Sequence, residues 1–325
     1  MDVLNFFKDK IIYHITDGDL DGIGSLIVSK IFVEPVCKKI DYYSTFDRDL
    51  PVFDLKKAEE ADIIIFTDLA PFSLSFYNQI NKDLNKVYIF DHHATTRSIL
   101  SELPNYFFDI ERCGSKIFFD FLSQDVKVKK SLIEFIDLIQ TYDLFQTDSP
   151  IWRQAKGLNN LLFALVDWNL KNEGVSFHLA SEKFINSQIN KLINRDTFFF
   201  TPLEKELIFK AENKEKQYFK QAKVSLKIRQ DNSGNNYGVF SCASKISLVS
   251  HLLLNDLNGK VDYLVGFSTW DKNNTKISLR SGKNGIDVST IASLWGGGGH
   301  KNSAGIDFKE KEKLNDFLEG KFHLI

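Results

Sequence analysis

The sequence predicts an α/β protein whose first domain is a doubly wound parallel sheet and whose second, smaller domain is also α/β. Over residues 10–95, short apolar runs alternate with stretches of helical pattern, which is typical of parallel strands joined by crossover helices. The chain of 325 residues is also longer than one hydrophobic core usually organises. These two observations together indicate two α/β domains.

Four short runs rich in Ile, Val, Tyr and Phe are the predicted strands, because each is stopped by polar residues. They are KIIYHIT at 10–16, KIDYYST at 39–45, ADIIIFTD at 61–68 and KVYIFDHH at 86–93. Helical patterns lie between them, in GIGSLIVSKIF and around LKKAEEA. Three of the four runs lead into aspartates. Since ligands of open α/β sheets bind outside the carboxyl ends of the strands, we expect those aspartates to converge on one edge.

The rest of the chain is predicted to be helical first and β-rich afterwards. Residues 114–145 and about 155–223 have a helical pattern, and LEKELIFKAENKEKQYFKQAK has the charged face of a connecting helix. After it, VSLKIRQDNSGNNYGVFSC predicts a hairpin, and VDYLVGFSTWDKNNTKISLRS predicts two strands around an Asn-rich turn. We therefore expect a first domain over 1–190, a helical connector over 191–224 and a second domain over 225–325.

Composition excludes several classes of protein. The formal net charge of −2 argues against an extended basic surface for nucleic acid. The three cysteines have no metal-type spacing, and so sparse a set favours a reducing compartment. There is neither a secretory leader pattern nor a run of about 18 apolar residues. We expect a cytoplasmic protein that does not bind a membrane.

Acidic and histidine side chains follow the predicted strands. They are Asp17, Asp19 and Asp21 in ITDGDLDGIG, Asp68 in FTDLAP, and Asp91, His92 and His93 in FDHHATT. A lone aspartate at a strand end is most often a helix cap or turn residue, but so many cannot all be caps. A divalent cation relieves repulsion among such carboxylates, and oxygen-rich sets favour Mn²⁺ or Mg²⁺. The sequence therefore predicts a metal site.

Two further residues have open interpretations. Asp143 in IQTYDLF follows a helical segment among apolar residues and is the candidate that completes the site. Its alternative role is that of a turn residue at the C-terminal end of a helix. His14 lies near the acidic stretch but out of register with it, so it is predicted as a strand residue, with a ligand role as the alternative.

A glycine run near the C-terminus predicts an anion site. Gly297, Gly298 and Gly299 precede His300 in LWGGGGHKNSAG, and open backbone N–H groups let an anion approach closely. We expect a helix to begin after them with its positive end toward the anion. A flexible linker is the alternative, although a linker does not need the apolar flanks or the histidine. Arg280 in ISLRS is predicted on a strand, either binding phosphate or simply exposed.

These motifs, in this order and over nearly the whole chain, resemble those of the DHH–DHHA1 phosphoesterase superfamily. The matching residues are DGDLDG at 17–22, Thr67-Asp68, DHH at 91–93, Tyr142-Asp143, SLRS at 278–281, and GGGH at 297–300 with Ala304-Gly305. Within the superfamily, DLDGIGS, FTDLAP, DHHATT, TFFFTPLEKEL and GGGGHKNSAG resemble the nano-RNase B branch of oligoribonucleases. The resemblance implies a catalytic DHH domain and a smaller DHHA1 domain that closes a cleft over short nucleotides.

The resemblance also implies roles for individual residues and two divalent metal ions, Mn²⁺ or alternatively Mg²⁺. One ion would be held by Asp17, Asp19 and Asp68, and the other by Asp21, Asp68, His92 and Asp143. Asp91 would orient the histidines, and His93 would contact the scissile phosphate. Substrate phosphate would be bound by Arg280, Gly297, Gly298, Gly299 and His300. Many relatives have histidine at the first metal position. This chain has Asp17 there instead, an aspartate that RecJ-like members share, and the extra carboxylate favours a hard ion.

The implied activity is exonucleolytic hydrolysis of short oligoribonucleotides to nucleoside monophosphates by a two-metal mechanism. The near-neutral charge suits short single-stranded oligonucleotides or dinucleotides better than long polymers. Linear or cyclic di- and oligonucleotide signals and phosphoadenosine-type monoesters stay open as substrates. So does a catalytically silent nucleotide-binding module. A family II pyrophosphatase is a further alternative, but enzymes of that family lack the GGGH loop that this chain has. The sequence leaves a homodimer open.

Overall fold

A five-stranded parallel sheet forms the centre of the first of two units, Met1–Phe209 and Lys210–Ile325. The computed structural model describes residues 3–45, 53–71, 73–81, 85–173, 177–269, 275–308 and 311–318. The strands are β1 (Ile11–Asp17), β2 (Lys39–Thr45), β3 (Ile63–Thr67), β4 (Val87–Asp91) and β5 (Tyr106–Phe108), in the order β2-β1-β3-β4-β5. The four predicted strands are confirmed. The three-residue β5 was not predicted, because it is too short to show a period.

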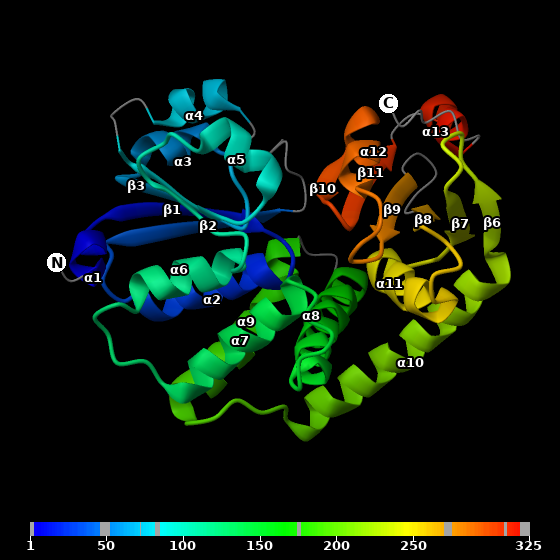
Figure 1. Cartoon of the computed structure of the whole chain (residues 1–325). Helices are drawn as coiled ribbons and strands as arrows, with labels where there is room; N and C mark the ends of the chain where they lie inside the picture. The colour runs from blue at the N-terminus through cyan, green and yellow to red at the C-terminus, as the bar shows by residue number, and fades with distance from the viewer. Residues whose placement is uncertain are drawn as a thin grey trace. The chain divides into compact units, whose positions relative to one another are not determined.

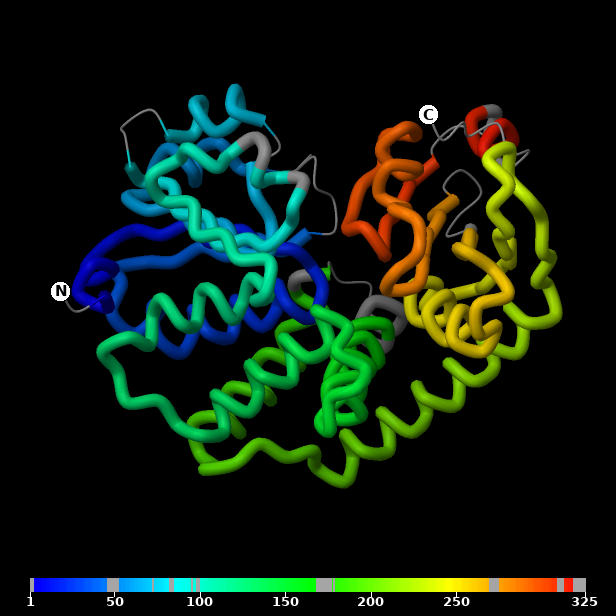
Figure 2. The backbone as a smooth tube through the Cα atoms, viewed as in Figure 1, coloured from blue at the N-terminus to red at the C-terminus, as the bar shows by residue number. Residues whose placement is uncertain are grey.

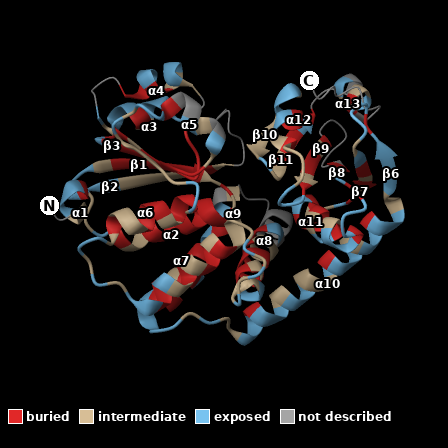
Figure 3. Ribbon diagram, viewed as in Figure 1, coloured by how far each residue is buried: buried red, intermediate tan, exposed pale blue. Residues whose placement is uncertain are grey.

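Helices cover both faces of this sheet (Figures 1 and 2). One face packs against α3 (Leu55–Glu60), α4 (Leu74–Ile80) and α5 (Ala94–Leu100). The other packs against α2 (Leu20–Phe32), α6 (Gly114–Leu122), α7 (Lys130–Asp143), α8 (Trp152–Glu173) and α9 (Phe177–Asn194), with the short α1 (Val3–Phe7) beside them. Because strand side chains alternate, Ile64 and Phe66 enter the first core while Ile63 and Ile65 enter the second. The whole of β3 is therefore buried (Figure 3).

The second unit contains a six-stranded mixed sheet in the order β10-β11-β9-β8-β7-β6. Its elements are β6 (Lys227–Gln230), β7 (Asn236–Ser241), α11 (Ile246–Leu257), β8 (Tyr263–Thr269), β9 (Thr275–Ser281), α12 (Val288–Leu294), β10 (Gly298–His300), β11 (Ser303–Phe308) and α13 (Lys311–Leu318). The predicted hairpin is β6–β7, and β8 pairs with β9 antiparallel, as expected. One core contains residues of α12 and α13, and the other contains residues of α11 and α10 (Pro202–Ser225).

The predicted helix after the glycine run is wrong. Gly298, Gly299 and His300 form β10, which pairs antiparallel with β11. A Cβ added to Gly297 would lie 2.2 Å from the carbonyl oxygen of Gly305. The glycines therefore let two backbones approach closely, as glycine often does within strands. Ser303–Phe308 forms the next strand, β11, because it pairs with β9.

A buried ion pair fixes the start of α10 to α9. Lys191 Nζ lies 2.8 and 2.9 Å from the two carboxylate oxygens of Glu204, and these side chains are only 10% and 8% exposed. Glu204 also accepts a hydrogen bond from the N–H of Thr201, whose hydroxyl accepts one from the Glu204 N–H, a capping box. None of the helices in the described parts of the chain is long and apolar enough to span a membrane.

Replacing Lys191 by Met should lower the free energy of unfolding by about 3 kcal/mol, because the Glu204 carboxylate would stay buried without its cation. The double variant K191M/E204L should recover most of that loss, since both charges are then absent. Urea unfolding of the variants provides the measurement. The control is Lys130→Met in the exposed pair with Glu134, where a change below about 1 kcal/mol is expected. A K191M loss no larger than that of K130M would contradict the anchoring role.

Candidate metal centre

Asp68 lies at the carboxyl edge of the sheet, directly after β3. Its backbone is left-handed, with φ of 54°, a conformation that Asp adopts more readily than most residues. Its N–H donates to the carbonyl of Phe90 at 2.9 Å. The residue is 3% exposed, and burial, with the charges of Asp21 and Asp19, raises the pKa of its carboxyl well above the ordinary value.

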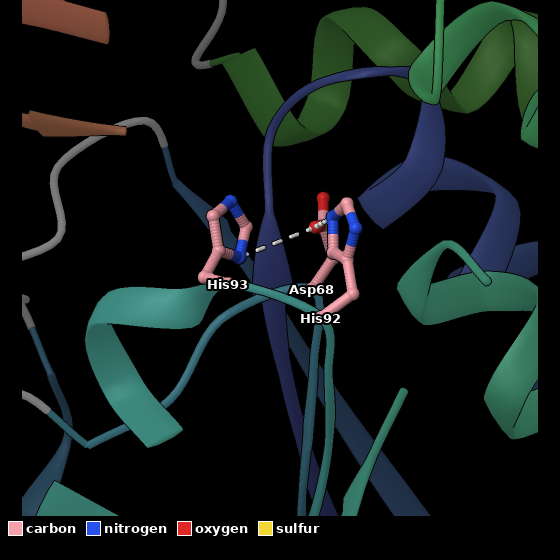
Figure 4. A group of neighbouring side chains, drawn as sticks. All are labelled: Asp68, His92 and His93. Atoms are coloured by element: carbon pink, nitrogen blue, oxygen red, sulfur yellow. Dashed lines mark ion pairs between the residues drawn. The ribbon is translucent and has the colours of Figure 1, made fainter. Parts of the chain in front are cut away.

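The His92 imidazole meets two carboxylates from different parts of the chain. Its Nε2 lies 3.3 Å from Asp68 Oδ1 and 3.4 Å from Asp143 Oδ2. Figure 4 shows His92 and His93 both turned toward the Asp68 carboxylate. Burial, with the nearby His93, lowers the pKa of His92, which favours the neutral ring that binds metals.

Asp143 is the last residue of α7. A carboxylate at the C-terminal end of a helix faces the negative end of the helix dipole, which is unfavourable. Burial, with the charges of Asp21 and Asp19, raises the pKa of this carboxyl well above its ordinary value. A residue that only formed a turn could be polar and uncharged and would avoid both unfavourable effects. The contact with His92 groups Asp143 with the side chains that can bind a metal.

Asp91 and His93 form a tightly held pair at the end of β4. His93 Nδ1 lies 2.7 Å from Asp91 Oδ1, and the hydroxyl of Thr96 donates to the other oxygen of Asp91. Although burial alone would raise it, the charge and hydrogen bond of His93 lower the pKa of Asp91 to about 2. Asp91 is thus an ionised, fully buried carboxylate that orients the His93 ring.

Asp21 is held by the N-terminus of a helix that begins 93 residues later. The N–H groups of Gly114 and Ser115 donate to its two carboxylate oxygens, at 2.6 and 2.9 Å. A side chain at residue 114 would collide with the site, because an added Cβ would lie 2.7 Å from the Asp68 nitrogen and 2.8 Å from its Cα. Gly114 therefore allows α6 to touch Asp21 and Asp68 at once.

Asp17 is the last residue of β1, and Asp19 immediately precedes α2. Asp19 caps α2, accepting hydrogen bonds from the N–H groups of Asp21 (2.9 Å) and Gly22 (3.1 Å). The helix starts close to the strand end, because an added Cβ at Gly22 would lie 2.0 Å from the carbonyl oxygen of Asp17. Burial, with the charge of Asp21, raises the pKa of Asp19.

The donor atoms form two groups, within each of which they lie within 4.8 Å of one another. The groups are Asp68, His92 and His93, and Asp21, His92 and Asp143. Asp17 and Asp19 are in neither group, although their charges act on Asp68 and Asp143. Such an oxygen-rich set with imidazole fits a divalent cation of the Mn²⁺ class. Burial and, after it, the neighbouring carboxylates raise the pKa values of Asp19, Asp68 and Asp143, and a cation would offset both effects.

His14 lies in the interior of β1 and belongs to neither donor group. Its Nε2 lies 2.9 Å from the hydroxyl of Thr67. That hydroxyl donates to the hydroxyl of Thr16 (2.9 Å), which in turn donates to the Thr67 carbonyl (2.8 Å). Burial lowers the pKa of His14 to about 3. Its observed place is that of a neutral residue supporting the ends of β1 and β3.

In the second unit, Arg280 and His300 lie in one cross-strand row. Arg280 on β9 is opposite Ser303 on β11, and Ser303 is opposite His300 on β10. Directly opposite residues of an antiparallel pair have their side chains on the same face. The sheet register therefore places the Arg280 and His300 side chains on one face, beside the strand formed by the glycine run.

Gly114, Ser115 and Thr96 were not predicted as site residues. The signal for Gly114 was a glycine at the first position of a helix, in CGSK, although alanine favours a helix more strongly. The signal for Thr96 was its place in DHHATT, five residues after Asp91. Neither signal specifies a partner without the tertiary structure.

Comparisons with known proteins give consistent matches. The DHHA1 domain matches residues 243–320. The chain is 28% identical over 320 residues to oligoribonuclease NrnB of Bacillus subtilis (strain 168), covering 92% of this chain and 73% of that one. It is 23% identical over 361 residues to a 3′,5′-cyclic-nucleotide phosphodiesterase of Helicobacter pylori (strain ATCC 700392 / 26695), covering 95% and 97%.

A solved structure supports the fold. RecJ from Thermus thermophilus, in complex with Mn²⁺, matches with a TM-score of 0.55 and 13% sequence identity, covering 98% of this chain and 52% of that chain. At this identity the match concerns the fold alone. Together with the DHHA1 match, it confirms the resemblance that the motifs predicted.

Replacing Gly114 by Ala should weaken Mn²⁺ binding at least about tenfold and lower the free energy of unfolding by about 1–3 kcal/mol, because the new Cβ displaces Asp68. Calorimetric titration of metal-free protein with Mn²⁺ and urea unfolding measure the two effects. Gly157→Ala in α8 is the matched control, since its Cβ would meet nothing closer than 3.5 Å. Equal Mn²⁺ affinity in both variants would contradict the packing role of Gly114.

The pKa of His14 predicts a pH dependence of stability. His14 binds a proton near pH 6.5 in the unfolded chain but only near pH 3 in the folded chain. The free energy of unfolding therefore falls as the pH drops between these values. Between pH 7 and pH 5, wild type should lose about 2 kcal/mol more than His14→Gln. Urea unfolding at both pH values tests this, with His251→Gln as the control. Equal losses in wild type and H14Q would refute it.

Proposed function

Because this chain is a hydrolase of the DHH–DHHA1 family, we propose that it hydrolyses short oligoribonucleotides exonucleolytically to nucleoside monophosphates, using divalent metal ions. The observation that carries the proposal is the His92 imidazole, which lies within 3.4 Å of both Asp68 and Asp143 in a buried carboxylate cluster. The similarity to an oligoribonuclease supports the choice of substrate.

The proposal assigns the metal ligands residue by residue. One ion would be held by Asp17, Asp19 and Asp68, and a second by Asp21, Asp68, His92 and Asp143. Mn²⁺ would be preferred to Mg²⁺ because the set is rich in oxygen and contains imidazole. Bound divalent cations supply the positive charge that activates water and stabilises charge on a phosphate. The grouping of Asp21, His92 and Asp143 supports the second set.

His93 and Asp91 are assigned to the scissile phosphate. Asp91 holds His93 at Nδ1, so we assign Nε2 to a hydrogen bond with a phosphate oxygen. An ionised Asp91 keeps the ring in one orientation and holds a proton on Nδ1. In the imidazolium form Nε2 carries the second proton and donates it to the phosphate oxygen. His93 is therefore the catalytic residue that touches the substrate, and Asp91 is its positioning residue.

The second unit is assigned to substrate binding. Arg280 and His300 share one face of its sheet, where a guanidinium and an imidazole can bind the same phosphate group. Gly297, Gly298 and Gly299 keep side chains away from that row, so a phosphate can approach the backbone. Recognition of a terminal phosphate would make cleavage exonucleolytic.

A second candidate function is hydrolysis of linear or cyclic dinucleotide signals. It uses the same residues and differs only in the substrate. The similarity to a 3′,5′-cyclic-nucleotide phosphodiesterase over 95% of this chain supports a phosphodiester substrate other than an oligoribonucleotide. The ratio of the hydrolysis rates of an RNA dinucleotide and a cyclic dinucleotide tests the cyclic signal, and the ratio of the rates for an RNA pentamer and an RNA dinucleotide tests the linear one.

With Mn²⁺ and RNA oligomers of two to five residues labelled at either end, wild type should release mononucleotides stepwise. Asp68→Asn and His92→Ala should each reduce the rate at least about a hundredfold, the loss that even residues supporting metal ligands cause. Asp148→Asn, at an exposed carboxylate, should retain full activity. Chromatography of the products measures the rates and shows the polarity.

Metal binding supplies a readout that does not depend on turnover. Mn²⁺ should raise the unfolding temperature of wild type and of D148N, and raise that of D68N much less, because a ligand stabilises the state that binds it. Stabilisation by Mn²⁺ without hydrolysis of any oligonucleotide would favour a silent binding module. Full activity in D68N would overturn the proposed site.

A further inference from the structure

Phe145 has a backbone conformation that its side chain disfavours, two residues after Asp143. Among the described residues, six non-glycine residues have positive φ, and four of them are Asp or Asn. The other two are Phe145, at 55°, and Lys245. Asp and Asn tolerate the left-handed region, whereas a bulky residue there is an outlier.

The end of α7 requires a left-handed residue at this point. The N–H of Gln146 donates to the carbonyl of Thr141 (3.0 Å), and the N–H of Phe145 donates to the carbonyl of Tyr142 (3.1 Å). These are the two hydrogen bonds of the Schellman motif, in which the left-handed residue is usually glycine. The backbone of Phe145 is therefore strained, whereas a glycine at this position would not be. Compared with glycine, phenylalanine contributes an aromatic ring.

That ring belongs to an aromatic cluster made of Tyr142, Phe145 and Trp152. Trp152 stacks on Tyr142 with centroids 5.7 Å apart and planes 11° from parallel. Phe145 lies 5.1 Å from Trp152 and 6.4 Å from Tyr142. All three residues are partly exposed, and the Tyr142 hydroxyl accepts a hydrogen bond from buried Asn159 at 2.8 Å. The cluster is thus fixed by helices and still reached by solvent.

We propose that this aromatic cluster, with Phe145 as its key residue, stacks against a nucleobase of the oligonucleotide bound at the metal centre, an inference that rests on the proposed function. Asp143 directly follows Tyr142 in the chain and contacts His92, so the cluster adjoins a residue assigned to the metal centre. The carboxylates there repel an anionic backbone, whereas the uncharged faces of bases stack on aromatic rings with little regard to sequence.

The test measures stacking directly with an RNA dinucleotide that contains 2-aminopurine, whose fluorescence falls when the base stacks. The full chain is titrated into the probe with Ca²⁺ present. Wild type should quench the probe. Phe145→Leu, which keeps an apolar side chain without a ring, should bind about tenfold more weakly, and Phe145→Tyr should restore binding. Phe209→Leu, at a 60% exposed ring on α10, is the matched control and should bind like wild type.

A dinucleotide without bases separates stacking from a structural role. In calorimetric titrations F145L and wild type should bind it equally, so an equal loss of affinity for both dinucleotides would show that Phe145 merely supports the fold and would overturn the proposal. Absence of quenching by wild type, wild-type affinity in F145L, or failure of F145Y to restore binding would also overturn it. Quenching by wild type together with no hydrolysis in Mn²⁺ would instead refute the proposed function and leave the stacking site standing.

Discussion

Mutual repulsion among aspartates at the carboxyl edge of the first sheet is the constraint on which the rest of the site depends. Burial brings these carboxylates into a medium that weakly screens their charges, so the fold must supply fixed partners. It does so with backbone N–H groups and an imidazole. The first turn of α2 donates to Asp19, the first residues of α6 donate to Asp21, and His93 faces Asp91. Helices α2 and α6 therefore serve the site as well as the core.

Neighbouring groups compensate the buried charge of some aspartates more than that of others, and this difference distinguishes the roles of the aspartates. Asp91 keeps a low pKa because His93 and Thr96 compensate its burial. Asp68 and Asp143 have raised pKa values, because burial and neighbouring carboxylates outweigh what the protein offers them. A cation adds most where compensation is least. The electrostatics thus favour Asp68 and Asp143 as ligands and Asp91 as the support of a histidine, as the motif resemblance implied.

How far the sequence predicts this protein depends on whether a feature is local. The four strands and the convergence of Asp68 and His92 follow from short apolar runs and from parallel topology, so they could be predicted. Asp143 ends a helix, so its pattern alone left a turn role open and its ligand role came from the motif resemblance. The bond from Gly114 to Asp21 could not, because it joins residues 93 apart. The glycine run was predicted to start a helix, since only the pairing with β11 and β9 shows that it is a strand. Nothing in the sequence around Phe145 indicated that its backbone is left-handed.

Both candidate sites owe their precision to strand register. In the first unit, Thr16 and Thr67 hydrogen-bond across β1 and β3 immediately before Asp17 and Asp68. In the second, the row of Arg280, Ser303 and His300 exists only in the observed pairing. A slip of one residue would turn each side chain to the opposite face of its sheet. The close strand approach that Gly297 permits is therefore a condition for the Arg280–His300 face, because a side chain there would separate β10 from β11.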